Sequence, residues 1–71
     1  MAILHPVTRR FARRLRQSRA AAGLTQAALA ERAQLAQPYL SQLERGIREP
    51  SIVTVVHLAK ALGVKPGALL D

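Results

Sequence analysis

Residues 25–45 read TQAALAERAQLAQPYLSQLER, and this stretch decides the fold. Its apolar residues recur at helical spacing in two short groups with a brief break between them. Thr25 can cap a helix over residues 26–33, because its hydroxyl accepts a hydrogen bond from an N–H group that the first helical turn leaves without a partner. The second group predicts a helix over residues 37–45, in whose first turn Pro38 is tolerated.

A longer helix is predicted before this stretch. Pro6 and Thr8 mark its start, and Gly23 marks its end because glycine takes the left-handed conformation beyond a helix without strain. One side of this helix is formed by Phe11, Leu15, Ser18 and Ala22. Residues 1–7 lack periodicity, so we expect an N-terminal arm there and a single domain over residues 8–71.

The segment after Pro50 and Ser51 is ambiguous between strand and helix. Residues 52–56 read IVTVV, and β-branched side chains favour a strand. We reject the strand because no second strand is available to pair with it and because a helical spacing runs through Ile52, Val55, Leu58, Ala59 and Leu62. After Gly63, a last turn over residues 66–70 is predicted to place Leu69 and Leu70 against the core.

The positive charge of the chain is concentrated near its start. The formal net charge is +7, but residues 23–71 hold five basic and four acidic side chains, a net of only +1. The rest lies in residues 1–22, which contain no acid and six arginines: Arg9, Arg10, Arg13, Arg14, Arg16 and Arg19. This excess predicts an anionic partner, with the positive field centred on the first helix.

Composition argues against several other classes of protein. The chain has no cysteine, which excludes a disulfide framework or a thiolate metal site and fits a reducing compartment. No apolar run approaches the roughly 18 residues that span a bilayer. His5 and His57 have no carboxylate at ligand or triad spacing, so we expect no enzyme, no bound metal and no cofactor.

The two helices of the opening stretch meet the physical requirements of a helix-turn-helix. Ala30 is small enough to let the helices approach closely, and apolar contact comes from Leu29, Ala33, Leu35, Leu40 and Leu43. The outer side of the second helix carries Gln37, Pro38, Ser41, Gln42 and Arg45. Polar groups on that side suit a helix lying in the major groove of DNA, so we predict the motif over residues 26–45 and a recognition helix over 37–45.

The order of further pieces strengthens this prediction. Between Leu15 and Leu70 the chain contains, in this order, the pieces LRQSRAAAGLTQAALA, YLSQLERG, EPS and LAKALGV. Together these pieces resemble the lambdoid phage repressor and Cro family, also called the XRE family. The resemblance implies an all-α, five-helix, lambda-repressor-like fold. It also implies a cytoplasmic, nucleoid-associated transcriptional regulator of prokaryotic or phage type, which binds a partly palindromic double-stranded operator as a homodimer.

The resemblance also implies which side chains read bases. Gln37 would read adenine, because its amide matches the N6 donor and N7 acceptor in the major groove, a contact worth about 1–3 kcal/mol in discrimination. Gln42 is the second candidate, and Ser41 lies on the same side. Pro38 can offer only apolar contact, for example to a thymine methyl group. For Tyr39 two roles stay open: packing on the DNA, or a partly buried place in the core.

Other positions are implied to bind the DNA backbone or to hold the fold. Thr25 and Gln26, at the start of the second helix, would contact phosphate, and Gln26 would also support Gln37. Further phosphate contacts are expected from Arg45 and Arg48. A structural ion pair is expected between Arg19 and Glu44. One departure from the family concerns the turn, where Gln34 replaces the usual glycine and a left-handed backbone would cost about 1 kcal/mol or more.

Two rival interpretations also fit parts of the sequence. Residues 1–22 are amphipathic, rich in arginine and free of acid, as in a mitochondrial transit peptide or a membrane-surface helix. We reject this because the same residues supply the first helix of the domain. The other rival is an antitoxin or a similar protein-interaction module in which DNA binding is secondary. It leaves a toxin or polymerase contact open, although we expect no free toxin-binding tail.

Overall fold

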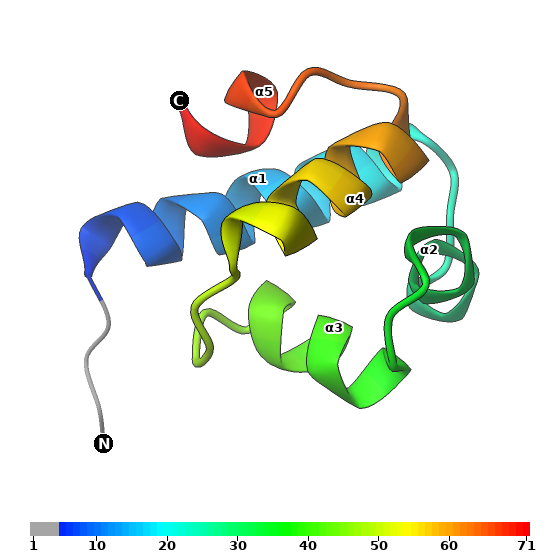
Figure 1. Cartoon of the computed structure of the whole chain (residues 1–71), viewed down its shortest axis with the longest axis horizontal. Coiled ribbons are helices and arrows are strands. Elements are labelled where there is room, and N and C mark those ends of the chain that lie inside the picture. The colour runs from blue at the N-terminus through cyan, green and yellow to red at the C-terminus, as the bar shows by residue number, and fades with distance from the viewer. Residues whose placement is uncertain (1–4) are drawn as a thin grey trace.

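The part of the chain that the computed structural model describes, residues 5–71, consists of helices joined by short turns (Figure 1). The five helices are α1 (Pro6–Ala21), α2 (Gln26–Ala33), α3 (Gln37–Glu44), α4 (Ile52–Leu62) and α5 (Gly67–Leu70). The predicted all-α, five-helix class is confirmed, and residues 52–56 are helical despite their β-branched side chains. None of the helices within residues 5–71 is long and apolar enough to cross a membrane.

Side chains cap three of these helices at their N-terminal ends. The Thr25 hydroxyl accepts a hydrogen bond from the N–H of Ala28 at 3.0 Å, as its place before α2 predicted. Ser51 does the same for Thr54 in α4, also at 3.0 Å. At α1 the cap is His5, whose Nδ1 accepts a hydrogen bond from the N–H of Val7 at 3.0 Å. Each cap satisfies an N–H group that the first turn cannot, which sets where the helix begins.

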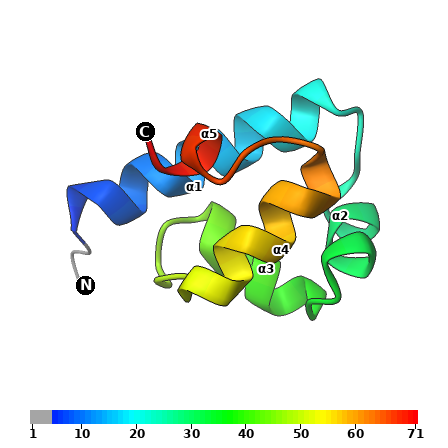
Figure 2. The same ribbon diagram turned by 45° about the horizontal axis from the view of Figure 1, so that its top comes forward.

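The helices pack so that α3 lies at one edge of the molecule. Figure 1 shows α3 on the opposite side from α5 and from the connection between α4 and α5, and Figure 2 shows the same arrangement after a turn. α5 packs on α1, while α2 contacts both α3 and α4. The scaffold therefore supports the inner side of α3 and leaves its outer side open to a partner.

Every helix contributes to one aliphatic core. The largest fully buried side chains are Phe11, Leu15, Leu29, Leu40, Leu43, Leu58 and Leu69. Burying one such side chain contributes roughly 1.5–3 kcal/mol relative to leaving it in water. Because leucines from all five helices meet at this core, the position of α3 depends on all of them.

Several details differ from the sequence-based expectations. α1 begins at Pro6, so the predicted arm of residues 1–7 overlaps the helix, and residues 1–4 lie outside the described part. Ile52 is 84% exposed, because the first residue of α4 projects beyond the core, and Ala22 is also exposed. Leu70 is 39% exposed: in the single turn of α5 only Leu69 faces inward.

The turn between α2 and α3 has the left-handed backbone that glycine usually provides. Gln34 has φ 59° and ψ 43° and is the one non-glycine residue with positive φ in residues 5–71. The N–H of Leu35 donates to the carbonyl of Ala30 at 2.8 Å, which closes the end of α2. A residue with a Cβ atom at this φ costs about 1–2 kcal/mol. The turn thus keeps the helix-turn-helix geometry at the expense of some stability.

Candidate nucleic-acid interface

The predicted recognition helix, α3, has one face in the core and one face open. Leu40, Leu43 and Glu44 are buried. Gln37 and Pro38 are exposed at the start of the helix, whereas Ser41 and Gln42 further along are half-buried. The helix ends at Glu44, one residue before the predicted end, and Arg45 follows as its exposed C-cap. The N-terminal end of α3 is therefore the part most available to another molecule.

The buried Glu44 carboxylate fixes the other end of α3. Glu44 is 3% exposed and takes two hydrogen bonds from Arg19 of α1, from Nε to Oε2 at 2.6 Å and from Nη2 to Oε1 at 3.0 Å. The hydrogen bond to Glu44 raises the pKa of Arg19, aided by charge attraction and opposed by burial. The structure thus brings together the two residues of the expected ion pair, with the geometry that suits a guanidinium and a carboxylate.

Two further contacts to Glu44 were not foreseen from the sequence. Gln26 of α2 donates from Nε2 to the Glu44 Oε1 at 3.3 Å, so in this structure its amide supports Glu44 and not Gln37 as expected. Arg16 donates from Nη1 to the backbone carbonyl of Glu44. A cation near the carbonyls that end a helix is favourable. The spacing of Arg16 and Arg19 on one side of α1 was the available signal.

Tyr39 connects α3 to α4. It is half-buried, and its hydroxyl lies 3.4 Å from the Oγ1 of Thr54, which also accepts a hydrogen bond from Ser51 at 3.0 Å. Arg48 lies over the Tyr39 ring, with its Cζ 5.4 Å from the ring centroid. Of the two roles left open for Tyr39, this placement fits the partly buried place beside the core.

The same arginine also contacts a predicted base-reading residue. Arg48 donates from Nη1 to the Oε1 of Gln42 at 3.4 Å. The stacking on Tyr39 and this hydrogen bond together hold an exposed guanidinium beside α3. The contact uses one of the two lone pairs of the Gln42 Oε1 and leaves both Nε2 hydrogens available as donors to a base.

Comparison with known proteins identifies the class. Residues 10–71 match the family described as "Helix-turn-helix domain". The control protein C.BamHI of Bacillus amyloliquefaciens is 39% identical over 62 residues, which cover 86% of this chain and 76% of that protein. The uncharacterized HTH-type transcriptional regulator y4dJ of Sinorhizobium fredii is 52% identical over 42 residues, 59% of this chain and 54% of that regulator.

Solved structures agree with the sequence matches. The restriction-modification controller protein C.AhdI from Aeromonas hydrophila superposes with a TM-score of 0.87 at 38% identity, covering 92% of this chain and 98% of that one. SinR, the master regulator for biofilm formation solved in complex with DNA, superposes with a TM-score of 0.83 at 35% identity, covering 86% and 98%.

The chain belongs to the helix-turn-helix domain family of DNA-binding transcriptional regulators. This class is not enzymatic, and the predicted resemblance to the lambdoid phage repressor and Cro family, or XRE family, is confirmed. The chain spans only about half of y4dJ, at 54%, and 39% of a Mycobacterium tuberculosis regulator that it matches at 44% identity.

Proposed function

We propose that this chain binds double-stranded DNA sequence-specifically and regulates transcription from a partly palindromic operator, bound as a homodimer. The observation that carries the proposal is α3, whose inner side is locked to α1 and α2 through Glu44 while Gln37 and Pro38 stand exposed at its start. A rigid helix with an open N-terminal end is what major-groove docking requires. The similarity to SinR, solved in complex with DNA, supports it.

Base reading is assigned to the outer side of α3. Gln37, exposed in the first turn, offers both amide groups to adenine. Pro38 beside it offers apolar contact to a thymine methyl group. Gln42 would donate from Nε2, since Arg48 occupies its Oε1. Ser41 and the outer edge of Tyr39 lie next to these groups on the same helix and would contact the edge of the site.

Phosphate binding is assigned to positions on either side of α3. Thr25 and Gln26 lie at the start of α2, where free backbone N–H groups and the helix dipole favour an anion. Gln26 keeps a second Nε2 hydrogen for phosphate while donating the first to Glu44. Arg45 and Arg48 follow α3 and are both exposed. Contacts at both ends would fix the register of α3 in the groove.

The homodimer is assigned to an apolar surface formed by α1, α4 and α5. Ile52 and Val53 are 84% and 63% exposed, and Val7, Val56 and Leu70 are each about two-fifths exposed. Four of these five side chains line one depression of about 350 Å³: Val7, Ile52, Val56 and Leu70. Exposed apolar side chains gathered in one place are typical of an interface. A two-fold dimer would present two α3 helices to successive major grooves about 34–36 Å apart.

A second candidate function, a protein-interaction module such as an antitoxin, is favoured by the same apolar surface. A toxin or polymerase subunit would then cover Ile52 and Val56 in place of a second copy. Sedimentation of the purified chain separates the two. We expect a dimer that the I52K/V56K variant converts to monomer, while I47K, at an isoleucine outside the depression, leaves it intact. A wild-type monomer would favour the protein partner.

Selection from random duplex DNA tests the proposed function directly. The purified chain is expected to enrich one partly palindromic sequence, with half-sites one helical turn apart, in a complex of two chains per duplex. Gln37→Ala should relax the selected base at one position in each half-site. Failure of the wild-type chain to enrich any sequence, while it remains folded by circular dichroism, would contradict the proposal.

A further inference from the structure

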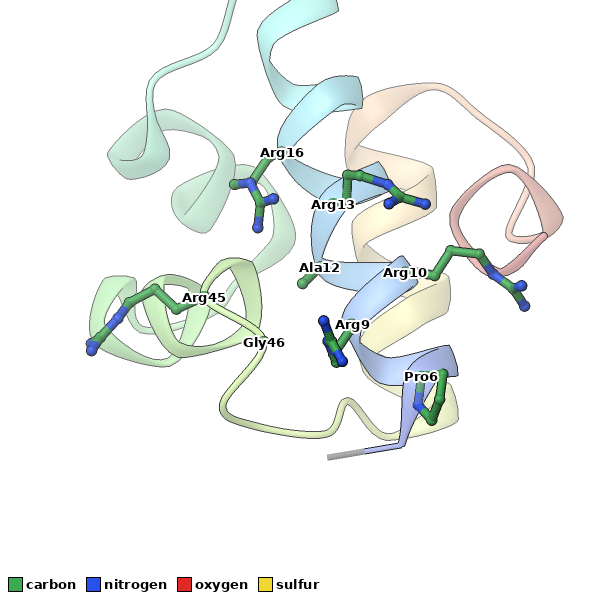
Figure 3. Close-up of a pocket in the computed structure, with 8 residues that line it drawn as sticks. All are labelled: Pro6, Arg9, Arg10, Ala12, Arg13, Arg16, Arg45 and Gly46. Carbon is green, nitrogen blue, oxygen red and sulfur yellow. The ribbon is translucent and has the colours of Figure 1, made fainter. Parts of the chain in front are cut away.

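The arginines of α1 form a recess that lies outside the helix-turn-helix. It has a volume of about 570 Å³ and lies where the N-terminal half of α1 meets the turn after α3 (Figure 3). Besides Pro6, Ala12 and Gly46, its lining consists of the arginines Arg9, Arg10, Arg13, Arg16 and Arg45. None of these lining residues is acidic, so the positive charge of the recess is not neutralised from within its walls.

The arginines of the recess differ in what they contact. Arg16 donates to the carbonyl of Glu44, and Arg10 points away toward α5 in Figure 3, where its Nη2 donates to the carbonyl of Leu70 at 3.3 Å. Arg9 lies in the gap beside Gly46, and the Arg45 side chain extends away from α1. Arg9 and Arg13 are exposed, and their side chains form no hydrogen bond or ion pair within residues 5–71. These two guanidinium groups are free to bind something else.

The spacing of these arginines does not help the helix. Arg9, Arg13 and Arg16 follow one another at four and then three residues, which places them on one face of α1. Like charges at this spacing repel one another and destabilise a helix, and no acidic residue of α1 offsets them. Guanidinium groups match phosphate well because their planar N–H groups can bind two oxygens at once. The presence of these three arginines on one face is therefore better explained by binding of an anionic ligand than by a contribution to the stability of the helix.

We propose that this recess binds the sugar-phosphate backbone of the same duplex whose bases α3 reads. Arg45 and Gly46 form one wall of the recess and also end the recognition helix, so a strand leaving α3 passes along the arginines of α1. From Arg9 to Arg16, α1 rises about 10 Å. One DNA strand carries about three phosphates over that length of duplex axis. The footprint thus extends past the helix-turn-helix to phosphates that Arg9 and Arg13 bind.

The salt dependence of binding tests this inference, which rests on the proposed function. The R9Q/R13Q variant removes two charges from the recess, and the matched control K60Q/K65Q removes two exposed charges that do not line it, one in the last turn of α4 and one in the connection between α4 and α5. Each lost phosphate contact reduces the slope of log K against log salt by about 0.9. In a dimer we expect the slope to become shallower by about 2 to 4 for R9Q/R13Q and to stay unchanged for the control.

Neutral backbone analogues locate the contact. Single methylphosphonate groups placed along the selected operator should weaken wild-type binding at two or three positions beyond those that Arg45 and Arg48 contact, and should have no effect there on R9Q/R13Q. Equal losses of slope in R9Q/R13Q and K60Q/K65Q would overturn the inference, because only the general field of the protein would then be acting. An unchanged slope of log K against log salt in R9Q/R13Q would also overturn the inference.

A failure of this inference can be distinguished from a failure of the proposed function. Both double variants keep Arg16 and Arg19, the arginines that contact Glu44, and thermal unfolding followed by circular dichroism checks that each variant folds. If wild-type binding depends on Gln37 while R9Q/R13Q behaves like the control, only the recess assignment fails. If no DNA sequence is preferred and Gln37→Ala changes nothing, the proposed function itself fails.

Discussion

The outer side of α3 and the N-terminal half of α1 are chemically opposite. The first turn of α3 presents Gln37 and Pro38 and carries no charge, whereas the α1 face that lines the recess carries several arginines and no acid. Amides distinguish bases but attract DNA weakly, while guanidinium groups attract any phosphate backbone without distinguishing sequence. Under the proposed function, this domain would separate sequence recognition from electrostatic attraction and place them on different helices.

The largest effect expected from this division is the salt dependence of affinity. If the dimer neutralises about 6–10 phosphates, log K should fall against log salt with a slope of roughly −5 to −9. Between 50 and 200 mM salt, affinity would then drop by about 10³–10⁵. Titration of the selected operator at several salt concentrations measures this. An affinity that hardly changes over the range would show that α1 and the other arginines contribute little.

The next largest effect is expected from breaking the ion pair between Arg19 and Glu44, which links α1 to α3. Arg19→Ala would leave the Glu44 carboxylate buried without its ionic partner, and breaking a buried pair in this way costs about 3–5 kcal/mol of unfolding free energy. Denaturant unfolding measures the loss. The control is Arg13→Ala on the exposed face of the same helix, which should change stability by less than about 0.5 kcal/mol. Similar stabilities for the two variants would contradict a structural role for the pair.

A pair of substitutions should separate recognition from attraction directly. Gln37→Ala is expected to lose about 1–3 kcal/mol of discrimination at one operator position, because a bidentate contact to adenine is removed. Arg48→Ala should weaken binding to operator and to unrelated duplex alike, because a phosphate contact carries no sequence information. Competition binding on operators mutated at each position reads out both. Parallel profiles for the two variants would show that the roles are assigned wrongly.

The smallest expected effect concerns the turn that sets the angle between α2 and α3. Gln34→Gly should raise the unfolding free energy by about 1 kcal/mol, since glycine adopts φ near 59° without the Cβ penalty. Thermal unfolding measures it, and Glu31→Gly within α2 is the control, which should destabilise by about 1 kcal/mol. Destabilisation by Gln34→Gly would show that its side chain contributes more than its backbone costs.

Much of the fold could be predicted because local signals agreed with one another. Thr25, Ser51 and the glycines at 23, 46 and 63 marked helix ends where the structure has them. Helical spacing outweighed the β preference of residues 52–56, since no partner strand existed. The individual errors lay at helix ends. Ile52 and Leu70 are apolar and in register, but a terminal residue projects past the core, and periodicity alone does not show where the core stops.

The candidate interface was less predictable, because it depends on contacts between residues far apart in the chain. The sequence indicated that Gln26, Glu44, Gln42 and Arg48 belonged to one functional region. It did not indicate that Gln26 would turn to Glu44 or that Arg48 would hold the Oε1 of Gln42. Each amide and guanidinium has several candidate partners at similar energy, and packing selects among them.

The same division applies to the N-terminal half of α1 and the outer side of α3. The sequence by itself determined that arginines gather in α1 and that α3 begins with uncharged residues, since composition and helical spacing are local properties. Only the tertiary structure decided that Arg9, Arg13 and Arg16 share a recess with Arg45 and Gly46 at the end of α3. Helix packing around a common core sets that proximity, and no pattern within either helix contains it.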